Sequence, residues 1–240
     1  MTMRAASADE EYIEQALEFL RTCVSSTQLK KYEYLFEEGH DAHDALGDCL
    51  MEGLSSFQPD LERWSLTMDS PEVFFDRLLL APSLQATYLY RVCRALHLRG
   101  VDRVPNVLAG VSRLLTGVQI YYSADIGPGL KVIHGHGTLI GAGCRIGSHF
   151  TIYQNVTVGD RLGKDSGTGK RPVIGDYVIA SAGAQILGPI TIGNRSIIGA
   201  NSLVLHSVPE NSIAAGIPAK VRVADMEEER FLDFWQAIKG

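Results

Sequence analysis

Two histidines are the residues of this chain best placed to do chemistry. His134 and His136 lie in the segment 132–137, which reads VIHGHG. Imidazole is the side chain that changes charge nearest neutral pH, so a histidine can take the proton of a hydroxyl group as a general base. His149 and His206 fall in predicted turns and are expected to be solvated. The pair in the glycine-rich segment therefore indicates proton transfer, with either histidine as a candidate base.

The histidine pair interrupts a six-residue repeat that runs through the second half of the chain. The stretch 174–209 divides into IGDYVI, ASAGAQ, ILGPIT, IGNRSI, IGANSL and VLHSVP, so an aliphatic residue or alanine opens each unit. The fifth residue of each unit is small or aliphatic. The same phase is occupied earlier by Ile120, Ile126 and Val132, and after a slip of two residues by Ile140, Ile146, Ile152 and Val158.

A period of six residues fits neither an α-helix, with about 3.6 residues per turn, nor a simple strand, with a period of about two. It is typical of a solenoid, in which each unit forms a short strand and a turn and three units make one coil of about 18 residues. The aliphatic residues then point inward, and the coils stack through backbone hydrogen bonds. The slip after Val132 predicts that both histidines lie at a corner. An ordinary β-sandwich of short strands is the alternative.

A charged, glycine-rich segment interrupts the repeat between Val158 and Ile174. It reads GDRLGKDSGTGKRPV, and insertions in solenoids project as loops, often on the binding face. Its spacing is similar to that of a phosphate-binding loop. However, Arg171 and Pro172 follow its GK instead of a serine or threonine at a helix start, which disfavours nucleotide hydrolysis. A solvated surface loop remains one interpretation.

The part of the chain before the repeat is predicted to be α-helical. Apolar residues recur there at helical spacing, and Ser70 followed by Pro71 marks a helix start. The predicted helices span 8–25, 42–54, 71–80, 83–98 and 105–116. The stretch 55–69 contains Pro59 and is predicted to be irregular.

These patterns divide the chain into three parts. An α-helical domain is predicted at 1–117 and a β-helix domain at 118–225, with the loop at 159–173. A C-terminal helix is predicted at 226–240, where apolar residues recur at helical spacing. Its apolar side chains are Phe231, Leu232, Phe234, Trp235 and Ile238. We expect this helix to pack on its own or a neighbouring subunit.

Composition narrows the function classes. The chain has 240 residues, of which 45% are hydrophobic and 21% charged, and its net charge is −6. An acidic balance without a long basic run argues against a nucleic acid partner, and no segment is long and apolar enough to suggest a membrane partner. The N-terminus lacks the apolar core of a signal peptide. The four cysteines are scattered without metal-like spacing, so a reduced cytoplasm and no metal site are expected. They are Cys23, Cys49, Cys93 and Cys144.

Three segments carry a resemblance to a known family. They are VIHGHGTLIGAGCRIGSHFTIYQNVTVG at 132–159, VIASAGAQILG at 178–188 and AAGIPAK at 214–220. The chain resembles the hexapeptide acyltransferases, and within them the serine acetyltransferases, over roughly residues 80–240. The resemblance implies an α+β fold, with an N-terminal α-helical domain followed by a left-handed parallel β-helix with a protruding loop. It also implies a trimer or a dimer of trimers, and favours a loop that closes over the active site.

The resemblance implies an activity and its site. Acetyl-CoA would donate its acetyl group directly to the hydroxyl of L-serine or a similar small hydroxy compound, without a covalent intermediate. His134 matches the catalytic histidine of the family, and His136 is the second choice. Acetyl-CoA would lie between neighbouring solenoids, against small residues that allow close approach, with a basic residue meeting a phosphate. These residues are Ala182, Gly183, Ala200 and Lys220, although plain repeat geometry explains the small ones equally well.

The chain departs from the family pattern around the base. Aligned without gaps, the aspartate that pairs with the catalytic histidine falls on Gln119, and the aspartate before that histidine falls on Ile133. A glutamine carbonyl can still orient the imidazole ring of His134. It supplies no negative charge for the imidazolium, so a weaker base is expected.

The acceptor side departs as well. The family's loop histidine falls on Arg171, and the arginine before it falls on Lys170. Both are expected to hold a substrate carboxylate, Arg171 through two parallel hydrogen bonds. Asp69, or with less support Asp76, stands roughly where the family offers an acidic group to the substrate amine.

Three alternatives stay open at this stage. The acceptor can instead be a sugar, an amino sugar or another biosynthetic hydroxy compound, which the missing acidic groups favour and the helical domain disfavours. A metal-dependent hydratase needs three converging histidines, and the spacing of His134, His136 and His149 is not persuasive. The third alternative is an inactive scaffold.

Serine acetyltransferases often dock a C-terminal isoleucine tail into a cysteine-forming sulfhydrylase. Because this chain ends in Ile238, Lys239 and Gly240, we expect no tight complex of that kind.

Overall fold

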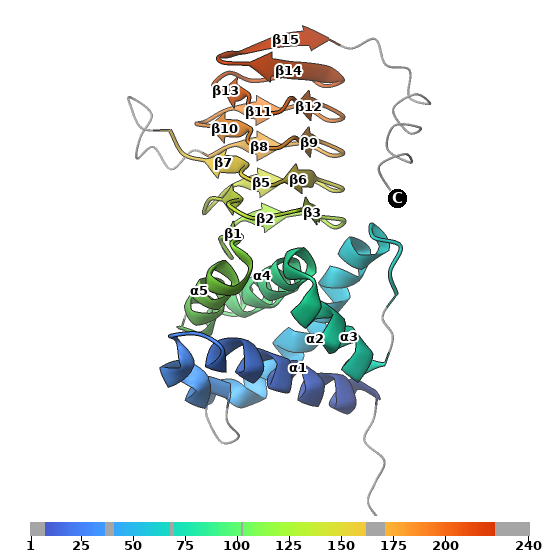
Figure 1. The fold of residues 1–240 in the computed structure, drawn as a ribbon, viewed down its shortest axis with the longest axis vertical. Coiled ribbons are helices and arrows are strands. Elements are labelled where there is room, and N and C mark those ends of the chain that lie inside the picture. The colour runs from blue at the N-terminus through green and yellow to red at the C-terminus, as the bar shows by residue number, and fades with distance from the viewer. Residues whose placement is uncertain (1–7, 37–40, 68–69, 102, 162–170, 224–240) are drawn as a thin grey trace, which may run out of the picture.

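The computed structural model describes residues 8–36, 41–67, 70–101, 103–161 and 171–223. Figure 1 shows helices at one end of the molecule and a stack of short strands rising from them. The predicted C-terminal helix at 226–240, the middle of the predicted loop, Lys170 and Asp69 lie outside the described residues.

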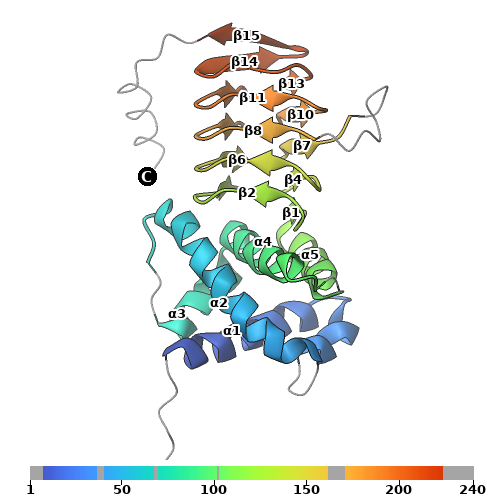
Figure 2. The same cartoon turned by 180° about the vertical axis from the view of Figure 1, so that it is seen from behind.

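Among the described residues, five α-helices and one 3-10 helix form the helical part, which Figure 2 shows from behind. They are α1 (Ala8–Ser25), η1 (Lys30–Phe36), α2 (Asp41–Glu62), α3 (Pro71–Leu80), α4 (Pro82–Leu98) and α5 (Arg103–Thr116). The helices predicted at 8–25 and 71–80 are confirmed at both ends, and those at 83–98 and 105–116 begin one and two residues earlier than predicted. The short η1 has no counterpart in the prediction.

The prediction of an irregular stretch at 55–69 is wrong for its first part. Helix α2 continues through Pro59 to Glu62. A proline inside a helix removes one hydrogen bond and costs about 3 kcal/mol. The side chains of Phe57 and Leu61 flank it and are 0% and 1% exposed, and burying each stabilises by about 2 kcal/mol or more. Burial of this helix face therefore offsets the cost of the proline.

An aromatic cluster fills the helical core. The ring of Tyr88 on α4 packs edge-on against Phe19, Phe57 and Phe74, with centroids 5.6–6.2 Å apart. Edge-to-face pairs of this kind add to the stabilisation from buried area. The cluster ties α4 to α1, α2 and α3, and so fixes the helix on which the strands are built.

The strands stack into a three-sided parallel β-helix. The first face holds β1 (Gln119–Ile120), β4 (Leu139–Ile140), β7 (Thr157–Gly159), β10 (Gln185–Leu187) and β13 (Leu203–Val204). The second face holds β2 (Asp125–Ile126), β5 (Arg145–Ile146), β8 (Val173–Ile174) and β11 (Thr191–Ile192). The third face holds β3 (Lys131–Ile133), β6 (Thr151–Tyr153), β9 (Ile179–Ala180), β12 (Ile197–Ile198), β14 (Ser212–Gly216) and β15 (Ala219–Val223).

Every strand pairs in parallel with the strand of the next coil, except that β15 returns antiparallel beside β14. The six-residue phase is confirmed, because the aliphatic residues assigned to the interior are all buried. Ile140, Ile152 and Ile192 are 0% exposed, and the least buried of the set, Ile120, is 7% exposed. The interior of the coils therefore forms one continuous hydrophobic core.

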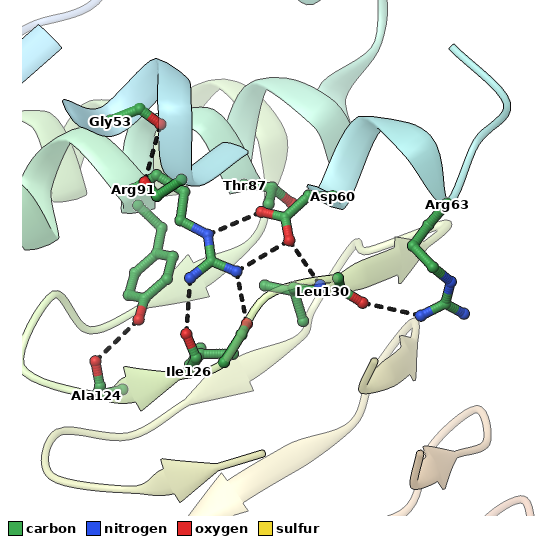
Figure 3. Close-up of polar contacts among 12 residues, drawn as sticks. Gly53, Asp60, Arg63, Thr87, Arg91, Ala124, Ile126 and Leu130 are labelled. Atoms are coloured by element: carbon green, nitrogen blue, oxygen red, sulfur yellow. Dashed lines mark hydrogen bonds and ion pairs between the residues drawn. The ribbon is translucent and has the colours of Figure 1, made fainter. Parts of the chain in front are cut away.

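A buried polar network joins the two parts of the molecule, and Figure 3 shows it in detail. Arg91 on α4 donates two hydrogen bonds to the Asp60 carboxylate, at 2.8 and 2.9 Å, and further bonds to the carbonyls of Ile126 and Gly127. Asp60 on α2 also accepts a 2.7 Å bond from the backbone N–H of Leu130. Two helices thus hold the backbone of the first coil directly before β3.

Candidate active site

His134 begins the turn that follows β3. Its backbone φ is 57°, a left-handed conformation that a residue other than glycine adopts rarely. Within the turn, the N–H of His136 bonds to the carbonyl of His134, and the N–H of Thr138 bonds to that of Gly135 at 3.0 Å. The two-residue slip in the repeat is this turn. It carries His134 away from the packed face, and the side chain is exposed.

The glycines in this segment are needed for close packing. A Cβ on Gly135 would lie 2.6 Å from a methyl group of Val118 and 2.9 Å from one of Val132. Gly137 has a φ of 74°, and a Cβ there would overlap the side-chain oxygen of Asn155 in the next coil. The backbone around His134 therefore fits tightly between its own coil and the next one.

The two histidines of the turn face different surroundings. His134 lines a cavity of about 410 Å³ together with Trp64, the segment 81–84 and Ile133. The ring of His136 lies over Gly117, directly after α5, where any Cβ would overlap it. The structure therefore places the His134 side chain at a cavity, which makes it the better supported candidate base.

The cavity lies where the helices meet the first coil. Trp64 follows α2 and Ile133 ends β3, while Ala81 joins α3 to α4 and residues 82–84 begin α4. Lys131 is only 2% exposed, and its ammonium lies 4.7 Å from the centre of the Trp64 ring. A cation over an aromatic face is attracted by it, so this contact holds Trp64 against β3.

Arg63 fixes the end of α2 beside the cavity. Its guanidinium donates to the carbonyl of Gly129 at 2.8 Å and to the hydroxyl of Thr151 at 3.0 Å. Burial lowers the pKa of Arg63 to about 10, against the opposing effect of the Asp60 carboxylate. The hydrogen bonds of Arg63 therefore position two coils of the β-helix relative to the end of α2.

The predicted cofactor residues lie on the same edge of the β-helix as the histidines. We call this edge the histidine corner: residues 134–138, 154–156, 181–184 and 199–202, which lead from the third face to the first. Ala182 and Gly183 follow β9, and Ala200 follows β12, so they stand in later coils above His134. Gly183 has a φ of 73°, and a Cβ there would overlap the side-chain oxygen of Asn201. The corner thus presents small residues at 181–184 and around Ala200, two and three coils above His134.

Lys220 stands near the far end of the solenoid. It lies on β15, opposite Ala215 of β14, and its side chain is exposed. The third face, which carries β14 and β15, borders the histidine corner. An extended ligand lying along the corner would therefore run from His134 toward Lys220.

Comparison with known proteins identifies the family that shares this repeat. The model of bacterial transferase hexapeptide repeats matches residues 171–206. The serine acetyltransferase of Bacillus subtilis (strain 168) is 38% identical over 157 residues, which cover 65% of this chain and 71% of that protein. The chain belongs to the serine acetyltransferase family. The serine acetyltransferase of Helicobacter pylori (strain J99) is 41% identical over 148 residues, or 62% of this chain and 85% of that protein.

Solved structures of the family have the same fold. The serine acetyltransferase of Brucella abortus strain S19 has a TM-score of 0.69 at 25% identity, and the match covers 91% of this chain and 85% of that one. A serine acetyltransferase in complex with CoA has a TM-score of 0.64 at 26% identity, covering 91% and 86%. The soybean enzyme complexed with serine has a TM-score of 0.66 at 27% identity, covering 91% and 85%. These structures confirm the predicted fold class.

Two further predicted site residues, Gln119 and Asp76, lie on other elements than His134. Gln119 lies on β1 opposite Leu139, and among the described residues its side chain makes no hydrogen bond to His134 or His136. Its proposed role stays a prediction. Asp76 is exposed on α3 and does not line the cavity.

Arg171 lies at a different corner of the same chain. It precedes β8, forms an ion pair with Asp160 at 3.0 Å, and lines a second cavity of about 460 Å³ with Arg145. This corner leads from the first face to the second, whereas the histidine corner leads from the third to the first. Within one chain, Arg171 and His134 therefore do not meet.

Two residues near the site were missed by sequence reasoning. Trp64 lines the cavity but is distant from His134 in the sequence, and the six-residue repeat does not predict its position there. Gln154 lies on the histidine corner, and its backbone carbonyl accepts the N–H of Gly183 at 2.9 Å. Its side-chain oxygen is buried without a hydrogen-bond partner in the part of the chain that the structure describes. The third residue of other repeat units is also polar, as in Asp176, Asn194 and His206, so no signal in the sequence pointed to Gln154.

Proposed function

We propose that this protein transfers the acetyl group of acetyl-CoA to the hydroxyl of L-serine or a similar small hydroxy compound. The observation that carries the proposal is the histidine corner, where His134 lines a cavity and small residues occupy the same corner two and three coils above it. Family membership supports the same reaction, since a relative is solved in complex with CoA and another with serine. By this activity the protein belongs to cysteine biosynthesis.

The reaction needs a base, a way to stabilise the oxyanion, and two substrates held together. His134 takes the proton of the acceptor hydroxyl as its oxygen attacks the thioester carbon. The tetrahedral intermediate then collapses, the carbon–sulfur bond breaks, and the proton passes from the imidazolium to the leaving thiolate of CoA. The acetyl group is bonded to the acceptor oxygen at the end, and no covalent enzyme intermediate is required.

CoA is assigned to the histidine corner. Ala182, Gly183 and Ala200 leave room for the pantetheine arm to approach the backbone, and Lys220 supplies a positive charge for a phosphate. Lys170 and Arg171 are assigned to a carboxylate of the acceptor, and Asp69 to an amine. Since Arg171 and His134 lie at different corners of one chain, a shared site needs two subunits. This supports a homotrimer, or a dimer of trimers, as the active assembly.

The environment and partners follow from the same proposal. The described helices include none long and apolar enough to cross a bilayer. Within the described ranges, no three His, Cys, Asp or Glu side chains form a group that could hold a metal ion. We assign the protein to the cytoplasm, with acetyl-CoA as co-substrate, and we expect no tight sulfhydrylase complex.

The decisive experiment is thiol release from acetyl-CoA by the purified protein, with His134→Ala and His136→Ala as matched variants. We expect His134→Ala to lower kcat by at least ~10²-fold, as removal of a general base does, while CoA still binds. His136→Ala should retain most of the activity. Near-normal turnover of His134→Ala together with a large loss in His136→Ala would move the base two residues along the turn. Absence of thiol release with every acceptor would reject acetyl transfer.

A further inference from the structure

The cavity of about 460 Å³ lies on the second face of the β-helix, where β5, β8 and β11 stack one above the other (Figure 1). It extends over three coils, from Arg145 on β5 through Val173 on β8 to Thr191 on β11. Arg171, which precedes β8, lines it as well. Two arginines therefore line one cavity, and of its described lining residues only these two are charged.

The strand register presents Arg145 to this cavity. Residues alternate across a strand, and the neighbouring Ile146 is 5% exposed in the core, so the exposed Arg145 side chain points outward. Its partners on the adjacent strands are Asp125 and Val173. Asp125 pairs with Arg94 at 3.1 Å, and among the described residues no carboxylate forms an ion pair with Arg145. The charge of Arg145 is therefore available to a ligand.

Arg171 is fixed beside Arg145 by two contacts. Its guanidinium forms an ion pair with Asp160 at 3.0 Å, and a Cβ added to Gly143 would lie 3.6 Å from its Cγ. The stem of Arg171 thus passes over the turn that leads into β5. Asp160 neutralises one of the two positive charges, so these three side chains leave an excess of positive charge at the cavity.

This cavity belongs to the part of the site that a second subunit would supply. Arg171 and His134 lie at different corners of one chain, and Arg145 lines the cavity with Arg171. A subunit that receives Arg171 beside its own base therefore receives Arg145 as well. In a closed three-fold ring whose axis runs along the β-helix, equal coils of the subunits lie at equal heights.

Height along the β-helix indicates which anion the cavity holds. His134 lies between the first coil (β1–β3) and the second (β4–β6), and Arg145 lies in the second, so their heights differ by about one strand spacing, roughly 5 Å. Lys220, assigned to a CoA phosphate, lies on β15, five strands beyond β3 and about 24 Å further along. At the height of the reacting groups, the anion that the two substrates offer is the carboxylate of the acceptor.

We propose that Arg145 is a specificity-determining residue: together with Arg171, it binds the carboxylate of a small hydroxy amino acid whose hydroxyl meets the partner subunit's His134. Guanidinium groups bind a carboxylate through short, charge-assisted hydrogen bonds, which a neutral group in its place cannot form equally well. This inference rests on the acetyl transfer and the three-fold assembly proposed above, and it adds a binding residue to them.

The test measures thiol release with L-serine and with L-serinamide, in which a neutral amide replaces the carboxylate. We expect the wild type to prefer L-serine. Arg145→Gln should raise KM for L-serine by at least ~10-fold, as the loss of a hydrogen bond between charged groups does, and should remove most of that preference. The values of KM for acetyl-CoA and kcat/KM for L-serinamide should stay within about twofold of the wild type.

Arg195→Gln is the matched control. Arg195 lies at another corner, between β11 and β12, where it donates a 2.7 Å hydrogen bond to Asn211. Its replacement removes a charge from the β-helix at a distance from the cavity, so the preference for L-serine should be unchanged.

The other outcomes overturn the proposal in distinct ways. Equal effects of Arg145→Gln on L-serine and L-serinamide, or no effect on either, would show that Arg145 does not bind the carboxylate. A rise confined to KM for acetyl-CoA would assign the cavity to a CoA phosphate instead. Absence of thiol release by the wild type with both acceptors would reject the acetyl transfer on which the inference rests, so the two failures are distinguishable.

Discussion

At the scale of single residues, the turn separates two histidines that are alike in sequence. His134 takes up the left-handed conformation and lines the cavity, whereas the ring of His136 lies over Gly117. A substrate in the cavity therefore meets the imidazole of His134. Gln119, which the sequence analysis predicts to orient this base, carries no negative charge.

Gln119→Asp tests whether this position supports the base. A carboxylate within reach of His134 would stabilise the imidazolium formed on proton transfer, so we expect kcat to rise by several-fold and the acidic limb of the pH–rate profile to move to higher pH. Gln119→Asn is the matched control, since it has the same shape as aspartate without the charge, and it should not shift the profile. Identical profiles for both variants would show that residue 119 does not contact the base.

Sequence analysis found the residues that lie at a slip in the repeat. It missed residues that reach the cavity from distant parts of the sequence. His134 and His136 were predictable because a slip in a regular period marks a corner. Trp64 was not predictable, because its approach depends on α2 running past Pro59 and on the anchoring of Arg63. The type of residue 171 also does not reveal that Arg171 lies at another corner than His134. Its corner depends on the number of strands and turns that separate Arg171 from His134.

At the scale of elements, the junction of helices and coils depends on buried charges. The Asp60 and Arg91 side chains are about 1% and 6% exposed, and their ion pair bonds the backbone before β3. Burial opposes the charged form of Arg91, but the adjacent Asp60 carboxylate raises the pKa of the guanidinium. Because β3 ends at Ile133, directly before His134, this network positions the turn that holds His134 through the strand.

Asp60→Ala should strongly destabilise the protein. It leaves Arg91 buried without its partner and removes the acceptor of the Leu130 N–H, which we expect to cost about 3–5 kcal/mol in the free energy of unfolding. Asp125→Ala is the matched control. Asp125 forms a 3.1 Å ion pair with Arg94, which lies on α4 as Arg91 does, but the Asp125 side chain is 69% exposed. Exposed pairs contribute at most about 1 kcal/mol. Urea denaturation measures both, and similar losses in the two variants would contradict the argument.

Elements with a strong period were predictable, and those held by tertiary contacts were not. The strand phase from Ile120 to Val204 follows from aliphatic spacing alone, because each inward position needs a buried side chain. The extension of α2 through Pro59 follows from burial of Phe57 and Leu61 in a core that the local sequence does not describe. The 3-10 helix η1 (Lys30–Phe36) is likewise fixed by packing of Leu35 and Phe36.

At the scale of the whole molecule, stability should fall at alkaline pH because all four cysteines are free and buried. Burial raises the pKa of Cys144 from 9.0 to about 11 and that of Cys23 to about 12. Between pH 9 and 11 the unfolded thiol of Cys144 is ionised while the folded one keeps its proton. The unfolded state then binds fewer protons, so the free energy of unfolding decreases as pH rises, by about 1.4 kcal/mol per pH unit for each such thiol.

Cys144→Ala isolates one of these thiols. Over pH 9–11 its free energy of unfolding should decline less steeply than that of the wild type, by about one bound proton. Urea denaturation at half-unit steps of pH gives both slopes. Parallel slopes would show that the Cys144 thiol ionises equally in the folded and unfolded states.

The arrangement of corners makes a prediction about the assembly. His134 lies on the corner between the third and first faces, and Arg171 on the corner between the first and second. If one site uses both residues, each must come from a different subunit, and a closed three-fold ring provides three such sites. His134→Ala and Arg171→Ala subunits would then each be inactive alone, yet together they would form some sites with both residues intact.

Mixing the two variants tests this directly. In trimers assembled at random from equal amounts, a site is intact when one subunit supplies His134 and its neighbour supplies Arg171. The probability of each is about one half, so about a quarter of the wild-type activity per site should return after joint unfolding and refolding. Each variant refolded alone is the control and should stay inactive. A mixture with no more activity than these controls would show that Arg171 acts within its own chain, or on the fold, and that the site does not span two subunits.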